Sequence, residues 1–136
     1  MFKLNERIDN DTFEICDLPL CTVRLMNDEQ YPWLILVPKI ANVSELHQLE
    51  MTDQQQLLLE INQASQVIED LFTPTKINIA SLGNMVSQLH IHVIGRFDSD
   101  IAWPGPVWGQ HPPCPYADEE IIHKLKVAFK HLQSRA

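Results

Sequence analysis

Two histidines lie one residue apart in a stretch where polar and apolar residues alternate. The stretch reads Ser87-Gln88-Leu89-His90-Ile91-His92-Val93-Ile94. Successive side chains of a β-strand point to opposite faces, so the alternation predicts a strand over residues 85–94 with Gln88, His90 and His92 on one face. The opposite face is mostly apolar and suits a core. The strand therefore presents polar side chains that could take part in catalysis or binding on one face, and apolar side chains that pack in the core on the other.

Three interpretations of the paired histidines are open from the residues alone. A neutral imidazole is a nucleophile at neutral pH and a protonated one donates to phosphate oxygen, so two rings can divide these roles. A zinc site is the second, although zinc takes three or four protein ligands and His47 or His111 would have to join. In the third, both are ordinary polar residues with hydrogen-bond partners. Their place on a largely apolar strand makes this less favoured.

Several further strands must position the histidine strand. The run Trp33–Val37 is apolar and bounded by prolines, which favours a buried strand over a helix. Gly83-Asn84 is a hairpin-turn signal directly before the histidine strand. We expect the two strands on either side of this turn to pair antiparallel, which brings Asn78 or Ala80 near the histidines. The other predicted strands are Thr12–Cys16, Cys21–Met26 and Lys76–Leu82.

Two helices complete the predicted fold. Thr52-Asp53-Gln54-Gln55 matches a capping box, and an apolar stripe follows from Leu57 to Leu71. A C-terminal helix is predicted over residues 117–133. The irregular segment 98–116 holds Trp103 and Trp108, for which packing is favoured over stacking on a base. Together these elements predict a single α+β domain, residues 1–136, with an antiparallel sheet of about five strands, one long helix and a C-terminal helix.

Composition limits the classes of partner. The chain has 136 residues, of which 45% are hydrophobic, and a net charge of −8. The acidity disfavours binding to a nucleic-acid backbone, and no apolar run is long enough for a membrane span. The N-terminus lacks the apolar stretch of a signal peptide, so we expect a cytosolic protein. Three cysteines without metal spacing predict reduced thiols that act as apolar fillers.

The histidine stretch and its surroundings resemble a known family. Gln88-Leu89-His90-Ile91-His92-Val93-Ile94 is similar to the signature of the histidine triad (HIT) superfamily, in which three histidines alternate with apolar residues. Leu34-Ile35-Leu36-Val37-Pro38-Lys39 resembles the strand that precedes the long helix of the family, and Asn78 and Gly95-Arg96 resemble elements that flank the signature. The likeness runs in order from about Thr22 to Phe97.

The resemblance implies a nucleotide-binding fold that is usually a homodimer. It also implies that His90 attacks the α-phosphorus of a nucleotide and forms a nucleotidyl-histidine, while His92 donates to a non-bridging phosphate oxygen. No metal or other cofactor is implied. Asn78, Asn84 and Ser87 are candidate nucleotide contacts. Lys39 and Arg96 are candidate anion contacts, but a solvated surface charge is favoured for each.

Two departures from the family pattern bear on activity. Gln88 stands at the first histidine of the signature, and Ala41 stands where the family has a further histidine after Pro-Lys. Gln88 can orient His90 or hold a phosphate oxygen, but it cannot supply a proton. We therefore expect an enzyme that favours substrates with good leaving groups. The alternatives are a nucleotide-binding module that has lost turnover and, third, a His-x-His metal-binding protein.

Overall fold

A single antiparallel sheet of five strands forms the centre of the protein. The computed structural model describes residues 1–134. The strand order is β1-β2-β3-β5-β4, and all neighbouring strands are antiparallel. The strands are β1 (Thr12–Asp17), β2 (Cys21–Met26), β3 (Trp33–Pro38), β4 (Lys76–Ala80) and β5 (Ile91–Arg96).

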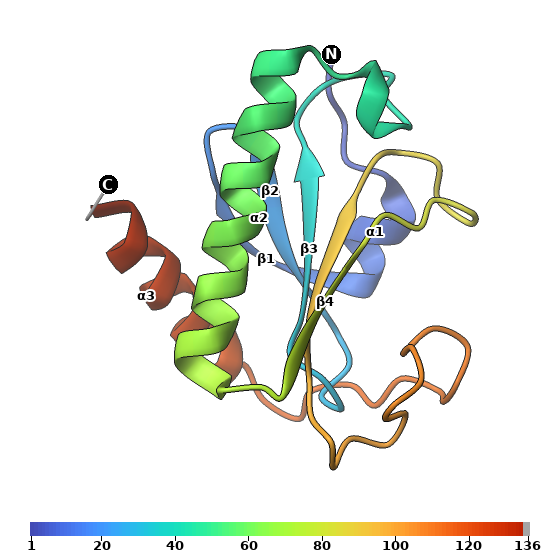
Figure 1. Cartoon of the computed structure of the whole chain (residues 1–136), viewed down its shortest axis with the longest axis vertical. Helices are drawn as coiled ribbons and strands as arrows, with labels where there is room; N and C mark the ends of the chain where they lie inside the picture. Colours follow the sequence, from blue (N-terminus) through green and yellow to red (C-terminus); the bar gives the residue numbers. More distant parts are fainter. Residues whose placement is uncertain (135–136) are drawn as a thin grey trace.

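Two helices cover one face of the sheet. Helix α2 (Met51–Phe72) and helix α3 (Glu120–Ser134) lie side by side on the left of the sheet in Figure 1. They bury alternate residues of the central strands, such as Leu34 and Leu36 of β3 and Val93 of β5. The period of two along these strands therefore assigns one set of side chains to this helical layer and the other set to the opposite face.

The opposite face is covered by irregular segments and a short helix. Helix α1 (Glu6–Asp11), the loop 81–90 and the loop 97–116 lie on this side (Figure 1). A second apolar cluster forms here from Ile8 of α1, Trp33 and Ile35 of β3, Ile94 of β5 and Val107 of the loop. The second core is smaller than the first, and it leaves room for a pocket.

The α+β class and the antiparallel sheet are confirmed, with boundary differences that matter for the site. The histidine strand was expected over 85–94, but β5 begins at Ile91, and residues 81–90 form a loop instead of a two-residue hairpin turn. Strands β4 and β5 still pair antiparallel, with Ala80 opposite His92. The loop is held by its own contacts, among them the hydrogen bond from the Leu89 N–H to the Val43 carbonyl, at 2.9 Å.

The starts of the helices also differ from the sequence prediction. Helix α2 begins at Met51 with Glu50 as its N-cap, so Thr52 lies inside the first turn and forms no capping box. Helix α1 was not predicted. Asn5 caps it by accepting a hydrogen bond from the Arg7 N–H, at 2.8 Å. Six residues are too few to show a helical apolar stripe, which explains why the pattern was not visible.

The loop after β5 is anchored by a buried ion pair. Arg96 and Asp100 are both almost completely buried, and their side chains are joined at 2.8 Å. Burial alone would raise the pKa of Asp100, but hydrogen bonds from Arg96, Phe97 and Trp103 hold it below its usual value. The Arg96 guanidinium also lies over the rings of Tyr31 and Trp103. The expected irregular segment is thus a fixed loop. Across residues 1–134, no helix has the length and apolar character needed to cross a bilayer.

Candidate active site

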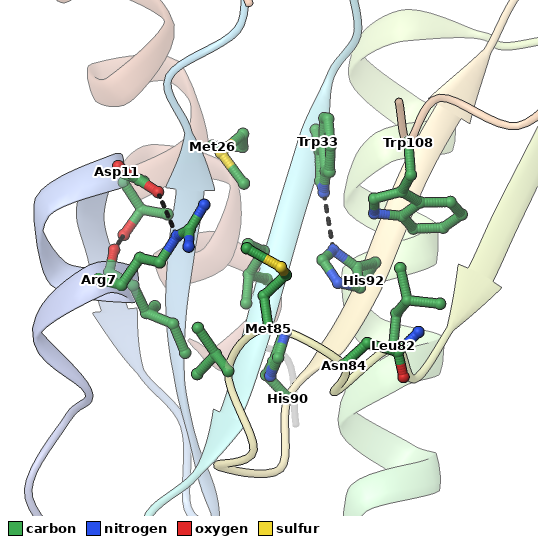
Figure 2. Close-up of a pocket in the computed structure, with 14 residues that line it drawn as sticks. Arg7, Asp11, Met26, Trp33, Leu82, Asn84, Met85, His90, His92 and Trp108 are labelled. Carbon is green, nitrogen blue, oxygen red and sulfur yellow. Dashed lines mark hydrogen bonds and ion pairs between the residues drawn. The ribbon is translucent and has the colours of Figure 1, made fainter. Parts of the chain in front are cut away.

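A pocket opens on the face of the sheet opposite α2. It has a volume of about 200 Å³ and lies between β3, β5, helix α1 and the loop 81–90. His90 and His92 form part of its wall, together with Trp33 and Trp108 (Figure 2). Across the pocket, Arg7 and Asp11 of α1 lie 3.8 Å apart, and both are about half exposed. The remaining lining is mostly apolar and includes Ile8, Met26, Ile35 and Val86.

The His90 ring is oriented by the backbone directly before β5. Its Nδ1 lies 2.7 Å from the carbonyl oxygen of Gln88. A carbonyl oxygen can only accept, so Nδ1 of His90 carries the proton. In the neutral ring this leaves a lone pair on Nε2, which is the form a nucleophile requires.

The His92 ring is oriented in the opposite sense. The Trp33 indole N–H donates to Nδ1 of His92 at 3.0 Å (Figure 2). An indole nitrogen can only donate, so Nδ1 of His92 carries the lone pair and the proton of the neutral ring sits on Nε2. Burial, followed by the charge of nearby His90, lowers the pKa of His92 to about 4. His92 is therefore a neutral donor at physiological pH.

The two rings lie close enough to act on one group. Their centroids are 5.0 Å apart at an interplanar angle of 70°. Trp108 packs against His92 with ring centroids 5.1 Å apart. Both histidines are nearly buried, with 6% and 5% of their surface exposed. One wall of the pocket thus presents a lone pair on one ring and an N–H on the other.

Gln88 does not join the histidines in the pocket. Its side-chain oxygen accepts from the Asn5 N–H and its side-chain nitrogen donates to the Lys3 carbonyl, both at 2.8 Å. Because the strand begins only at Ile91, the alternation expected from residue 88 onward does not extend to Gln88. Its side chain holds the N-terminal segment that leads into α1, while its backbone carbonyl orients His90.

The three expected nucleotide contacts lie in different places. Asn84 lines the pocket beside the histidines. Ser87 lines a neighbouring polar hollow with Gln88, Asn5 and Ser44. The side chain of Asn78 accepts from Arg96 at 2.9 Å and lies outside the pocket lining.

Several pocket residues were not singled out by the sequence. Arg7 and Asp11 come from α1, and Met26 and Trp33 come from the ends of β2 and β3. One feature of the sequence could have indicated Trp33. It lies on the same face of β3 as Ile35 and Val37, and pairing of β3 with β5 puts that face on the same side of the sheet as His92. No sequence spacing indicated which side chain would reach His92.

The chain offers little to hold a metal beside the histidines. Among residues 1–134, no group of three or more His, Cys, Asp or Glu side chains is placed to share an ion. The cysteines are likewise apart from the site. Burial raises the pKa of Cys16 to about 11 and that of Cys21 still further, so both are protonated fillers.

Comparisons with known proteins identify the family. The family model of the HIT domain matches residues 7–99. A histidine triad protein from Marinobacter aquaeolei is 45% identical, covers 97% of this chain and 98% of its own, and superimposes with a TM-score of 0.92. One from Sinorhizobium meliloti is 43% identical, with coverage of 95% and 96% and a TM-score of 0.91.

A more distant structure shares only the fold. The diadenosine triphosphate hydrolase of Plasmodium falciparum is 16% identical, covers 99% of this chain and 82% of its own, and gives a TM-score of 0.65. A comparison with curated protein sequences finds no match. The match over most of the chain, the two close structures and the paired histidines at the start of β5 agree: this chain belongs to the histidine triad family.

Proposed function

We propose that this protein is a nucleotide hydrolase or nucleotidyl transferase that acts at the α-phosphate of a nucleoside polyphosphate. The observation that carries the proposal is that the hydrogen bonds of Nδ1 hold His90 and His92, on one pocket wall, as opposite neutral tautomers. A two-step transfer at phosphorus needs one nucleophilic lone pair and donors for the charged oxygens. The distant diadenosine triphosphate hydrolase of the same fold supports this substrate class.

In the first step, the Nε2 lone pair of His90 attacks the α-phosphorus. A P–N bond forms, and the P–O bond to the leaving phosphate group breaks with its electron pair staying on oxygen. In the resulting nucleotidyl-His90, Nε2 is bonded to phosphorus and Nδ1 keeps its proton, so the ring carries a positive charge until the P–N bond breaks. In the second step, the oxygen of water or of another acceptor hydroxyl attacks phosphorus and its proton passes to solvent. The P–N bond breaks, and its electron pair returns to Nε2 of His90.

His92 supports both steps without changing its own protonation. Its Nε2–H donates to a non-bridging oxygen of the α-phosphate, where negative charge is concentrated. A neutral donor is sufficient for this task. Gln88 contributes through its carbonyl, which holds the Nδ1–H of His90 and keeps the attacking lone pair on Nε2.

The rest of the pocket is suited to a nucleoside. The apolar wall formed by Ile8, Met26 and Ile35 accommodates a base, and the carboxylate of Asp11 can accept from ribose hydroxyls. Arg7, whose Nε lies 3.8 Å from Oδ2 of Asp11 on the same helix, adds a positive charge to the pocket lining in a chain whose net charge is −8. The side-chain amide of Asn84, which lines the pocket with the histidines, can donate to a phosphate oxygen, and Ser87 lines the neighbouring polar hollow.

Mass spectrometry after incubation with a dinucleoside polyphosphate tests the proposal. We expect a nucleotidyl adduct on His90 under acid-free quench, together with released nucleotide. The adduct should be absent in His90→Ala and should accumulate when water is replaced by a poorer acceptor. Calorimetric binding with neither adduct nor product would instead identify a nucleotide-binding module without turnover. Stoichiometric metal, with activity lost to chelators, would favour the metal-binding alternative.

We further propose that the protein is a homodimer joined at β4. This strand is at the edge of the sheet, and Ile79 exposes 51% of its surface there. An unprotected edge with an exposed apolar residue favours pairing with another strand. Leu58 and Leu59 on α2 are also exposed, at 60% and 50%. Analytical ultracentrifugation should give the mass of two chains, and Ile79→Lys should shift it towards one.

A further inference from the structure

Two tryptophans contact the same histidine but differ in one respect. Trp33 and Trp108 both pack against the His92 ring, with centroid distances of 5.8 and 5.1 Å. The indole N–H of Trp33 donates to Nδ1 of His92, whereas the indole N–H of Trp108 is buried and has no hydrogen-bond partner in the structure. The two residues therefore offer similar ring contacts with and without the polar contact.

We infer that Trp33 is a positioning residue that fixes His92 as the Nε2–H tautomer and so holds its donor towards the phosphate. The inference deepens the proposed function and rests on it for the role of His92 in the reaction. The hydrogen bond between Trp33 and His92 does not depend on the proposed function, because it follows from the pairing of β3 with β5. In Figure 2 the Trp33 nitrogen points directly at the His92 ring, and the remaining ring nitrogen is free to face the pocket.

The strand register explains how one side chain can do this. Ile35 lies directly opposite His92 in the β3–β5 pairing, and Trp33 is opposite Ile94, so Trp33 is the diagonal neighbour of His92 on the same face. A diagonal distance of about 7–8 Å between such residues is within reach of an aromatic side chain. Trp33 is 7% exposed and packs edge-on against Tyr31 and Trp108, which fixes its rotamer.

Without the bond, the tautomer of His92 would not be determined. A neutral imidazole with no partner exchanges its proton between both nitrogens, and a fraction of such molecules would present a lone pair to a phosphate oxygen. Protonation of His92 would place a proton on Nδ1 facing the Trp33 N–H, where two donors would oppose each other. Trp33 thus disfavours both the wrong neutral form and the cation.

The other charged groups near His92 do not select a tautomer. His90 is the adjacent titratable group on the same face, and it raises the cost of a second positive charge. Arg7 and Asp11 face the pocket from α1 and are paired with each other. Arg96, further along β5, is paired with Asp100. On β3 and β4 the residues directly opposite His92 are Ile35 and Ala80, and Trp33 is its diagonal neighbour; none of these three side chains titrates.

Nitrogen-15 NMR of histidine-labelled protein tests the inference without any substrate. In the wild type we expect His92 to be a neutral Nε2–H tautomer from pH 5 to 8, and neutral His90 to carry its proton on Nδ1. In Trp33→Phe we expect mixed tautomers at His92 and a pKa higher by about one unit, since an ordinary neutral hydrogen bond is lost. Trp108→Phe is the matched control and should leave the His92 tautomer unchanged.

Activity provides the second measurement. Trp33→Phe should lower kcat more than it changes KM, because a fraction of the His92 rings would no longer present the Nε2–H to the phosphate. Should Trp33→Phe fail to fold, replacement of Trp33 by benzothienylalanine retains the ring shape and removes only the N–H.

Two results would overturn the inference: a proton on Nδ1 of His92 in the wild type, or an unchanged tautomer and pKa in the folded variant. Absence of any nucleotide turnover would remove the proposed function, while the tautomer assignment would stand on the NMR result.

Discussion

The side chain of Gln88 provides a sharp test of how this variant of the family works. The signature places it at a catalytic position, but the structure ties its amide to Asn5 and Lys3 through two hydrogen bonds of 2.8 Å. Those residues lead directly into α1, whose Arg7, Ile8 and Asp11 line the pocket. Truncation of Gln88 should therefore loosen the nucleoside side of the pocket and spare the histidines.

The magnitude follows from the two bonds. Each neutral hydrogen bond contributes about 0.5–1.5 kcal/mol net, and both lie partly open to solvent, which places their sum at about 1–2 kcal/mol. This is a local free energy, so Gln88→Ala should accelerate amide exchange of Asn5 and the first turn of α1 by about 5–30-fold. The carbonyl of residue 88 remains, so the orientation of His90 is retained.

Two assays on the same variant separate the possible roles. Hydrogen exchange should show faster exchange confined to the N-terminal segment, and kinetics with a dinucleoside polyphosphate should show a raised KM with a smaller effect on kcat. Gln66→Ala is the control, because the Gln66 side chain makes a comparable exposed bond to Asp70 on α2. If Gln88→Ala lowers kcat while exchange and KM stay as in the wild type, the Gln88 side chain acts in the chemistry and the reasoning here is wrong.

Three further predictions concern stability. Because the pKa of His92 is lowered from 6.5 to about 4, the unfolded chain binds one more proton than the folded chain between these pH values. The free energy of unfolding should therefore be highest above pH 6.5 and fall by up to about 3 kcal/mol towards pH 4. Denaturant titrations of His92→Gln should show a weaker pH dependence. Gly95→Ala should cost about 1–3 kcal/mol and lower Tm, since a Cβ there would lie 2.8 Å from Pro32; Gly83→Ala, with its nearest atom at 3.4 Å, should not. Glu60→Gln should cost about 1–3 kcal/mol in the free energy of unfolding, because the buried carboxylate accepts from two backbone N–H groups at the start of β2 and an amide retains only one acceptor oxygen; an unchanged denaturation midpoint would contradict this.

The elements with strong local signals were predictable. Strand β3 is recognisable as a continuous apolar run because both of its faces are buried, and α2 is recognisable by the helical spacing of its apolar residues because one of its faces is buried. The start of α2 was misplaced, since Thr52 and Gln55 have the letters of a capping box while the chain turns into the helix two residues earlier. Helix α1 is too short to carry any period.

For the site, the sequence by itself predicted that His90 and His92 point to the same side, because residues two apart in an extended segment share a face. In the structure His92 lies in β5, His90 directly precedes it, and both line the pocket. The sequence also placed them in a family signature. It did not determine where the strand begins, and so it placed Gln88 in the pocket, when its side chain in fact holds the N-terminal segment. Only the tertiary structure decided which nitrogen of each ring carries the proton. That choice depends on a backbone carbonyl and on an indole 59 residues away in sequence, and partners brought together by strand pairing leave no trace in the spacing of residues.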